Sequence, residues 1–206
     1  MIFTSIDAEK ADSLVAKNYN VSGFPTFVLT DSKGKEIDRV VGYLDADPFL
    51  EQIKNYMNGI GTLDDLLAKV KESQDRTLYF DIADKYKYRG GSDDAKSWFE
   101  KVIADGDKTD SLSGEASVSL ADMALRNKNY EKALTDFATI EVDFKGTQFA
   151  ETSILYSAYI YRAKMNDTTK SISEYERFAK TYPESKDAEY ATNKAAELRG
   201  ETTESN

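Results

Sequence analysis

The chain has 206 residues, of which 37 are acidic and 27 basic, so its formal net charge is −10. Without a block of Lys or Arg, such a chain lacks the phosphate-neutralising charge on which nucleic-acid binding depends, and DNA, RNA and anionic membrane surfaces are poor candidate partners. Cysteine and histidine are both absent, which excludes disulfides, thiolate nucleophiles, Ser-His-Asp triads and the common zinc sites. We therefore expect no catalytic residue, no metal site and no cofactor, and predict that this chain is not an enzyme.

The N-terminal residues show neither a targeting nor a membrane-spanning pattern. No run of about 18 apolar residues occurs in the chain, so no transmembrane segment is predicted. The apolar start, Met1–Ile6, lacks the basic flank and long apolar core of a signal peptide, and we expect a strand over residues 2–6. The compartment stays open between a bacterial periplasm or envelope and the cytoplasm.

The first quarter of the chain predicts a small mixed α/β arrangement. Runs rich in β-branched and aromatic residues indicate strands, and proline suits the first turn of a helix. Asn58–Gly61 ends the last of these helices and is the expected domain boundary. The earlier elements are a helix (Asp12–Tyr19), a strand (Phe24–Thr30), a hairpin turn (Asp31–Gly34), a strand (Lys35–Tyr43) and a helix from Pro48.

Residues 21–29, which read Val-Ser-Gly-Phe-Pro-Thr-Phe-Val-Leu, resemble the segment of thioredoxin-like proteins that carries their cis-proline. The turn at residues 31–34, the sequence Val41-Gly42-Tyr43 and the upstream segments at residues 6–9 and 16–19 also follow that family. The resemblance covers residues 1–57 and implies a partial thioredoxin-like domain over residues 1–60. It further implies a peptide-facing loop, whereas a simpler reading is that the proline only shapes the strand entry. The loop residues are Gly23, Phe24, Pro25 and Thr26.

The departure from the thioredoxin-like pattern is large. In that family a strand and a helix bearing Cys-x-x-Cys precede the point where this chain starts, and that strand lies between those equivalent to residues 2–6 and 27–30. Its absence would leave unpaired strand edges, which recruit other strands. Three explanations follow: a fragment of a longer protein, which we favour; a first strand that moves into the vacant place; or a homodimer in which a second copy fills it.

Beyond Gly61 the sequence reads as helix and turn, and it repeats itself. A shift of 38 residues superimposes a small residue, a second small residue 12 later, an aromatic 4 later and an apolar residue 3 later. Two antiparallel helices need small residues at their crossing and large ones beside it. The aligned sets are Ala83, Ala121 and Tyr159; Ala95, Ala133 and Ser171; Phe99, Phe137 and Tyr175; and Val102, Ile140 and Phe178.

This spacing resembles the tetratricopeptide (TPR) repeat, although the period is about four residues longer than usual. Tyr159 stands where a small residue is expected, so the third repeat is degenerate. A final helix over Lys186–Leu198 would cap the array. We thus predict an α+β protein: the partial thioredoxin-like domain, an all-α TPR-like array of helical hairpins over residues 61–200, and a disordered tail at 201–206. An ordinary helical bundle is the alternative.

The TPR resemblance implies a groove that binds a peptide or a partner protein, lined by the first helix of each pair. Aromatic and basic side chains there would suit a peptide with acidic character or a free C-terminal carboxylate. The alternative is that the aromatic residues belong to the core. The groove residues expected from the alignment are Phe80, Tyr88, Arg126, Tyr156 and Lys164.

Three functions are compatible with these patterns. The first is a protein-interaction module of a bacterial thioredoxin-like/TPR protein, chaperone-like and linked to redox homeostasis, with no redox activity in this chain. The second is a fragment of a thiol–disulfide oxidoreductase whose Cys-x-x-Cys lies upstream of Met1. The third is an envelope assembly scaffold, since Ser173–Pro183 also resembles repeats in bacterial envelope proteins.

Overall fold

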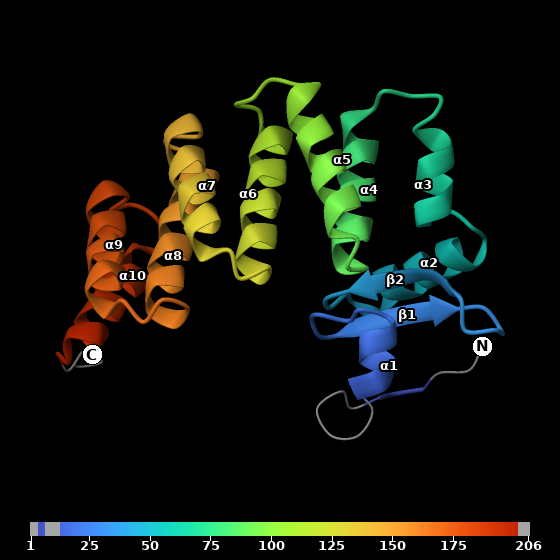
Figure 1. The fold of residues 1–206 in the computed structure, drawn as a ribbon, viewed down its shortest axis with the longest axis horizontal. Coiled ribbons are helices and arrows are strands. Elements are labelled where there is room, and N and C mark those ends of the chain that lie inside the picture. Colours follow the sequence, from blue (N-terminus) through green and yellow to red (C-terminus); the bar gives the residue numbers. More distant parts are fainter. Residues whose placement is uncertain (1–3, 7–12, 202–206) are drawn as a thin grey trace. The chain divides into compact units, whose positions relative to one another are not determined.

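The computed structural model describes residues 4–6 and 13–201 (Figure 1). The chain divides into two compact units, Met1–Lys101 and Val102–Asn206, and each is described by itself. Residues 4–6 form no regular secondary structure, and the rest of the strand expected over residues 2–6 lies outside the described residues. The same holds for all but Glu201 of the expected C-terminal tail.

From residue 13 on, the first unit has the predicted order of elements. Helix α1 (Ser13–Asn18) precedes strands β1 (Thr26–Thr30) and β2 (Glu36–Val41), which pair antiparallel, and helix α2 (Ala46–Met57) follows. The hairpin turn forms where Asp31 was expected to start it, because the Asp31 carboxylate accepts the backbone N–H groups two and four residues later, at 2.8 and 2.9 Å. Such side-chain bonds to the following backbone are typical of Asx turns.

Helix α2 covers one face of this hairpin. Its Ile53 and Tyr56 are buried with Val40 of β2, and the Phe49 ring lies 4.7 Å from the ring of Phe27 in β1. These apolar contacts form the core of the thioredoxin-like segment, and they leave the loop before β1 and the turn after it at the surface.

Three further helices contribute to the first unit: α3 (Leu63–Lys69), α4 (Arg76–Tyr88) and α5 (Ser92–Ala104), within which the division between the units falls. The two longer helices form an antiparallel hairpin (Figure 1). Its packing is aromatic, with ring centroids 5.3 Å apart for Phe80 and Phe99 and 5.6 Å apart for Tyr79 and Trp98.

The second unit is entirely helical within the described residues. Each helix packs against the next in sequence, around two apolar clusters, so the predicted array of helical hairpins is confirmed. The expected final helix is present as α10. The helices are α6 (Ser111–Arg126), α7 (Tyr130–Asp143), α8 (Gln148–Ala163), α9 (Thr168–Thr181) and α10 (Ala188–Arg199).

The aligned repeat positions are the buried positions of the helical hairpins. The small residues at the second position, the aromatics and the apolar residues are all at most 3% exposed, as a crossing packed at close range requires. The alignment therefore identified the contact face of each second helix. These residues are Ala95, Ala133, Ser171, Phe99, Phe137, Tyr175, Val102, Ile140 and Phe178.

The third hairpin departs from the alignment at its first helix. Tyr159 is 36% exposed, whereas Ala158 is completely buried. The Ala158 carbonyl accepts a hydrogen bond from the Ser171 hydroxyl at 2.9 Å. The reason is loop length: residues 89–91 and 127–129 connect the first two hairpins, but residues 164–167 connect the third. The extra loop residue moves the buried small position one residue earlier, so the alignment of Tyr159 with Ala83 and Ala121 was wrong.

Candidate protein-binding sites

The loop before β1 contains the four residues expected to face a peptide. The Phe24–Pro25 peptide bond is cis. The Pro25 carbonyl accepts a hydrogen bond from the Gly42 N–H at 2.9 Å, and the Thr26 hydroxyl donates to the Gly23 carbonyl at 2.8 Å. The Phe24 side chain is 68% exposed. The loop is thus fixed by backbone contacts and presents an aromatic ring to solvent, while its binding role stays a prediction.

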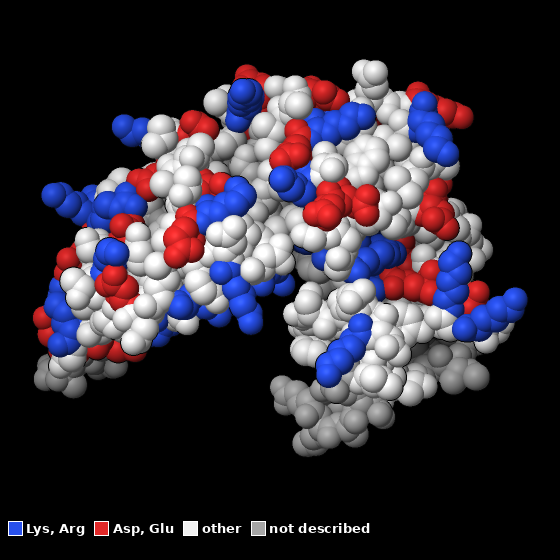
Figure 2. All heavy atoms as spheres, in the orientation of Figure 1, with Lys and Arg blue, Asp and Glu red and all other residues white. Residues whose placement is uncertain are grey.

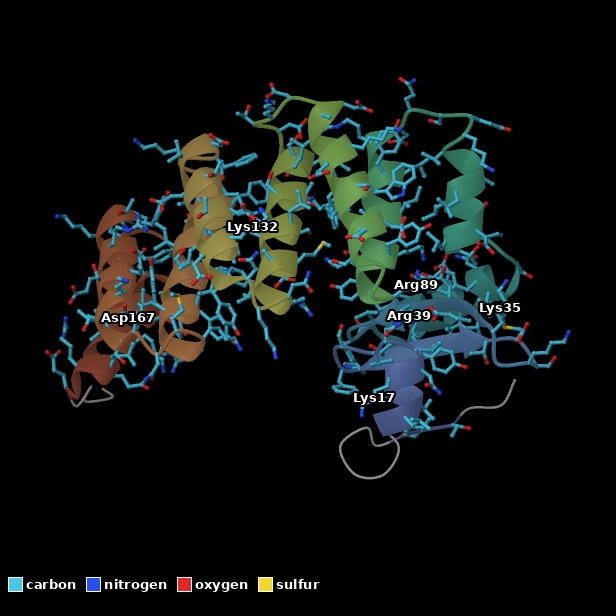
Figure 3. The ribbon with its side chains drawn as sticks, in the orientation of Figure 1. Lys17, Lys35, Arg39, Arg89, Lys132 and Asp167 are labelled. Carbon is cyan, nitrogen blue, oxygen red and sulfur yellow. The ribbon has the colours of Figure 1, made fainter. Side chains whose placement is uncertain are left out.

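A network of charged side chains joins β2 to the helices of the first unit, a feature that the sequence reasoning did not identify. Arg39 of β2 is only 4% exposed and forms a bidentate ion pair with Glu36, at 2.8 and 2.6 Å. It also donates to the backbone carbonyls of Tyr88 and Tyr19, at 2.5 and 2.7 Å. Figure 3 shows Arg39 and Arg89 close together, away from Lys35 at the hairpin tip.

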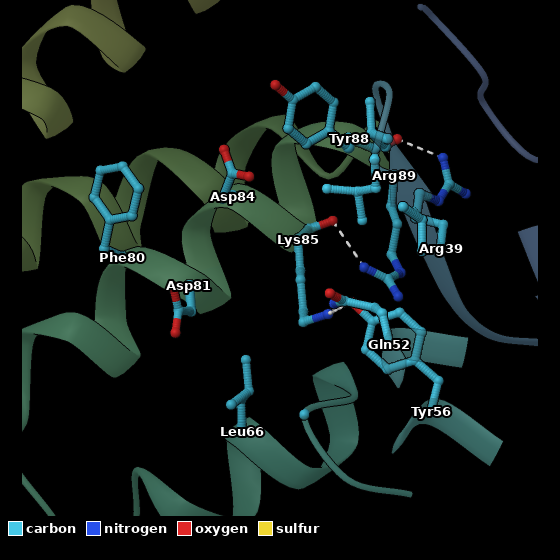
Figure 4. Close-up of a pocket in the computed structure, with 14 residues that line it drawn as sticks. Arg39, Gln52, Tyr56, Leu66, Phe80, Asp81, Asp84, Lys85, Tyr88 and Arg89 are labelled. Atoms are coloured by element: carbon cyan, nitrogen blue, oxygen red, sulfur yellow. Dashed lines mark hydrogen bonds between the residues drawn. The ribbon is translucent and has the colours of Figure 1, made fainter. Parts of the chain in front are cut away.

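Asp38 is the completely buried acid of this network. One carboxylate oxygen accepts from Lys85 Nζ at 3.0 Å and from the Arg89 guanidinium at 2.8 Å, and the other accepts from the backbone N–H of Leu63 at 2.8 Å. A buried carboxylate requires such partners, because leaving it unpaired costs several kcal/mol. Asp38 therefore connects β2 to the start of α3 and to the C-terminal end of α4. Figure 4 shows Lys85 and Arg89 at this end of α4, with Arg39 of β2 beside them.

Beside this network lies a pocket of about 530 Å³. Phe80 and Tyr88, two of the expected groove residues, line it together with the acids Asp81 and Asp84. Burial raises the pKa of the Asp81 carboxyl. The pocket's cations, Arg39, Lys85 and Arg89, already hold Glu36, Asp38 and backbone carbonyls, so this pocket has a structural role in the first unit.

The other three expected groove residues, Arg126, Tyr156 and Lys164, meet in a second pocket, of about 410 Å³, within the second unit. They come from the C-terminal end of α6, from α8 and from the loop that follows α8. The rest of the lining consists of Asp122, Leu125, Lys128, Tyr130 and Tyr159. This tyrosine–lysine pocket therefore combines three cations and three tyrosines with a single acid, whereas the chain as a whole carries a net charge of −10.

The tyrosine–lysine pocket has an aromatic wall packed on the core and exposed cations at its rim. The Tyr156 ring stacks on the buried Phe137 ring, with centroids 4.8 Å apart and planes 13° apart. The Lys164 ammonium lies 5.4 Å from the Tyr159 ring centroid, within cation–π range. Arg126 pairs with Asp122 at 2.6 Å. The aromatic surface is thus held by the core, while Lys128 and Lys164 are exposed to solvent beside it.

The sequence reasoning missed five lining residues of this pocket, and two of them, Lys128 and Tyr159, have an identifiable reason. Lys128 lies in the loop between α6 and α7 with a positive φ of 61°, the conformation that Gly90 adopts in the first hairpin, at φ 80°. A residue other than glycine is uncommon at positive φ. Lys128 at the turn where the first hairpin has Gly90 is therefore the sequence signal that could have identified it. Tyr159 was missed because its outward position depends on the extra loop residue described above.

Neither a charged patch of one sign, a metal cluster nor a membrane-spanning helix is found in the parts of the structure described below. Acidic and basic side chains are intermixed over the face shown in Figure 2. Among residues 4–6 and 13–201, no group of acidic side chains is placed to hold a metal ion. Over the same residues, every helix is too short or too polar to cross a membrane.

Comparison with known families assigns the two parts of the chain separately. Residues 2–57 match the family model of a thioredoxin-like domain, and residues 116–196 match that of YfiO, described as an outer membrane lipoprotein. Among curated proteins, none matches the chain. The thioredoxin-like match ends with α2, and the second match runs from α6 into α10. The chain therefore joins a thioredoxin-like segment to a TPR-like helical array similar to that of the outer membrane lipoprotein family.

Proposed function

We propose that the chain is a protein-interaction module that binds an acidic segment, or a free C-terminal carboxylate, of a partner protein in the tyrosine–lysine pocket. The observation that carries this proposal is the composition of that pocket, where Arg126, Lys128 and Lys164 stand among three tyrosines. Tyrosine and arginine dominate protein-binding hot spots, and a carboxylate accepts charge-assisted hydrogen bonds from such cations.

The test is a titration with an acidic peptide that ends in a free carboxylate, followed by fluorescence anisotropy of a dye on the peptide. Lys164→Glu reverses a charge at the pocket rim and should weaken binding at least about tenfold, because like charges at an interface repel. Lys145→Glu is the matched control, since it makes the same change at an exposed residue outside the pocket. Equal affinity of the two variants would refute the site.

A chaperone-like role follows if the bound segments belong to unfolded clients. The exposed Phe24 and Tyr43, 68% and 81% exposed on the thioredoxin-like segment, would add an aromatic contact surface, since exposed aromatic rings suit protein contacts. The chain should then slow the aggregation of a heat-denatured test protein, and Phe24→Ser should reduce that effect. Identical aggregation curves with and without the chain would exclude this role.

A second candidate function is a scaffold in envelope assembly, favoured by the match of residues 116–196 to the outer membrane lipoprotein family. The discriminating experiment is capture of the partner by in-cell crosslinking from a residue of the tyrosine–lysine pocket. An envelope protein as partner supports the scaffold, whereas mixed unfolded proteins support the chaperone-like role.

Thiol–disulfide chemistry would have to come from another part of a longer protein, because this chain contains no cysteine and the thiolate is the reacting group. We expect the chain by itself to show no reduction of insulin disulfides above the uncatalysed rate. A measurable rate would overturn this expectation.

A further inference from the structure

Arg162, in the last turn of α8, carries a buried hydrogen-bond donor without a partner. Its Nε atom is shielded from solvent, and no residue in the part of the chain that the structure describes accepts a hydrogen bond from it. A donor of a charged group that is left unpaired away from water is unfavourable. Such a group in a folded protein calls for an explanation, and one explanation is a ligand that pairs with it.

The side chain of Arg162 lies close to two further helices of the second unit. Helix α9 packs against both α8 and α10. Burial and a hydrogen bond with Tyr190 raise the pKa of Tyr175 in α9, whereas the positive charge of Arg162 acts to lower it. Lys194 and, to a smaller extent, Arg162 lower the pKa of the Glu197 carboxyl in α10. The charge of Arg162 is therefore felt on both α9 and α10.

The surroundings of Arg162 suit a carboxylate of a partner protein. The nearby acid, Glu197, is already held by Lys194 at 2.6 Å. Tyr190 is 52% exposed, and its ring stands edge-on to the buried ring of Tyr175, with centroids 6.0 Å apart. An arginine among tyrosines is typical of protein-binding hot spots, and a carboxylate can accept two parallel hydrogen bonds from one guanidinium.

Arg162 borders the tyrosine–lysine pocket. It lies three residues after Tyr159, which lines that pocket, and residues three apart on a helix are neighbours with Cβ atoms roughly 5–6 Å apart. Two residues of an extended segment span roughly 7 Å, and alternate side chains of such a segment point to the same side. An acidic side chain in the pocket therefore places the side chain two residues away within reach of Arg162.

We propose that Arg162 is a second anchor for the partner segment, and that this segment carries acidic residues at alternate positions. One carboxylate would contact the cations of the tyrosine–lysine pocket, and the other would accept hydrogen bonds from the Arg162 guanidinium. Because the Nε–H has no partner within the described structure, the guanidinium can turn toward the segment without breaking a hydrogen bond at this atom. This inference rests on the function proposed for the pocket and adds the spacing of acids that a partner needs.

The first test compares two dye-labelled, amidated peptides by fluorescence anisotropy. The alternate peptide reads Gly-Thr-Glu-Thr-Glu-Thr-Gly, and the adjacent peptide, Gly-Thr-Glu-Glu-Thr-Thr-Gly, has the same composition and charge. The alternate peptide should bind about five- to tenfold more tightly, because only its second carboxylate can form charge-assisted hydrogen bonds with Arg162.

The second test repeats both titrations with variants. Arg162→Gln should bind the two peptides equally, whereas Lys164→Glu should weaken the binding of both. Arg199→Gln is the matched control, because it makes the same change at an exposed residue of α10, and it should keep the preference for the alternate peptide. Circular dichroism checks that each variant keeps the fold.

The possible failures are distinguishable. Absence of binding by either peptide would overturn the function of the pocket and the second anchor with it. Equal affinity of the natural chain for both peptides, with weaker binding by Lys164→Glu, would overturn the second anchor alone. A preference that persists in Arg162→Gln would do the same. If Arg162→Gln and Glu197→Gln then lower the melting temperature non-additively, Arg162 belongs to an ion pair within the chain.

Discussion

The two compact units hold their elements together by different chemistry. In the first unit, Arg39, Asp38 and their partners form a network of buried and half-buried charges between β2 and the helices. In the second unit, apolar residues at equivalent positions of successive hairpins, such as Phe137 and Tyr175, form the clusters. The charged network occurs at one junction of the first unit, whereas the apolar packing is repeated from hairpin to hairpin in the second unit.

This difference shows what each kind of contact can specify. An ion pair with several hydrogen bonds is satisfied in one geometry, so the Asp38 network fixes how β2 meets α3 and α4, although burying charge gains little stability by itself. Apolar packing is less directional and tolerates substitutions that conserve volume. A repeated array can therefore be built from a simple spacing of small and large residues, but the junction between a sheet and helices needs specific partners.

The largest change in stability is expected from a substitution in the apolar core of the second unit. Phe137→Ala removes a completely buried ring that stacks on Tyr156 and should lower the free energy of unfolding of the second unit by about 3–5 kcal/mol. Chemical denaturation followed by circular dichroism measures it. Val142→Ala, at a residue that is 74% exposed in the same helix, should change it by less than about 0.5 kcal/mol.

A substitution in the charged network of the first unit should give the second largest loss of stability. Asp38→Asn removes the buried charge that Lys85 and Arg89 share, and should destabilise the first unit by roughly 3 kcal/mol, because Lys85 loses its carboxylate partner and Arg89 keeps only Glu36. Trp98, the single tryptophan of the chain, reports on this unit by fluorescence. Asp47→Asn, on the exposed start of α2, is the control. A loss no larger than that of the control would show that the network contributes nothing.

A close approach between helices of the second unit gives a smaller effect. A Cβ atom at Gly114 of α6 would lie 2.5 Å from the ring of Phe149 in α8. Gly114→Ala should therefore cost about 1–3 kcal/mol for overpacking, offset by about 1 kcal/mol of helix propensity. Gly23→Ala, where no atom lies within 4 Å, serves as the comparison. An unchanged melting temperature for Gly114→Ala would mean that the two helices can separate without loss.

The smallest effect concerns alkaline pH and Tyr175 of α9. Burial, followed by its hydrogen bond with Tyr190, raises the pKa of Tyr175 to about 12. Because the unfolded chain loses this proton near pH 10 while the folded one keeps it, the stability of the second unit should fall between about pH 10 and 12. Tyr175→Phe should flatten this part of the pH dependence. An equal slope for both proteins would assign the pH dependence to other groups.

The sequence was most informative where structure depends on local spacing. From α1 on, the elements of the thioredoxin-like segment follow in the predicted order, and the repeat positions other than Tyr159 are buried, because apolar periodicity reports which face of an element is covered. The charged network was not predicted, since Glu36, Asp38 and Arg39 pair with Tyr88 and Arg89, about fifty positions away at the C-terminal end of α4. Spacing within one element carries no information about such partners.

The lining of the tyrosine–lysine pocket likewise contains residues that the sequence predicted and residues that it did not. The alignment supplied Arg126, Tyr156 and Lys164, because the repeat determines which helix ends meet. Lys128 and Tyr159 joined them only in the tertiary structure, through a left-handed turn residue and one extra residue in the third loop. The sequence alone thus determined the order of elements and the buried face of each helix. The register of the third hairpin, the partners of each buried charge and the full lining of the pocket depended on how distant segments pack.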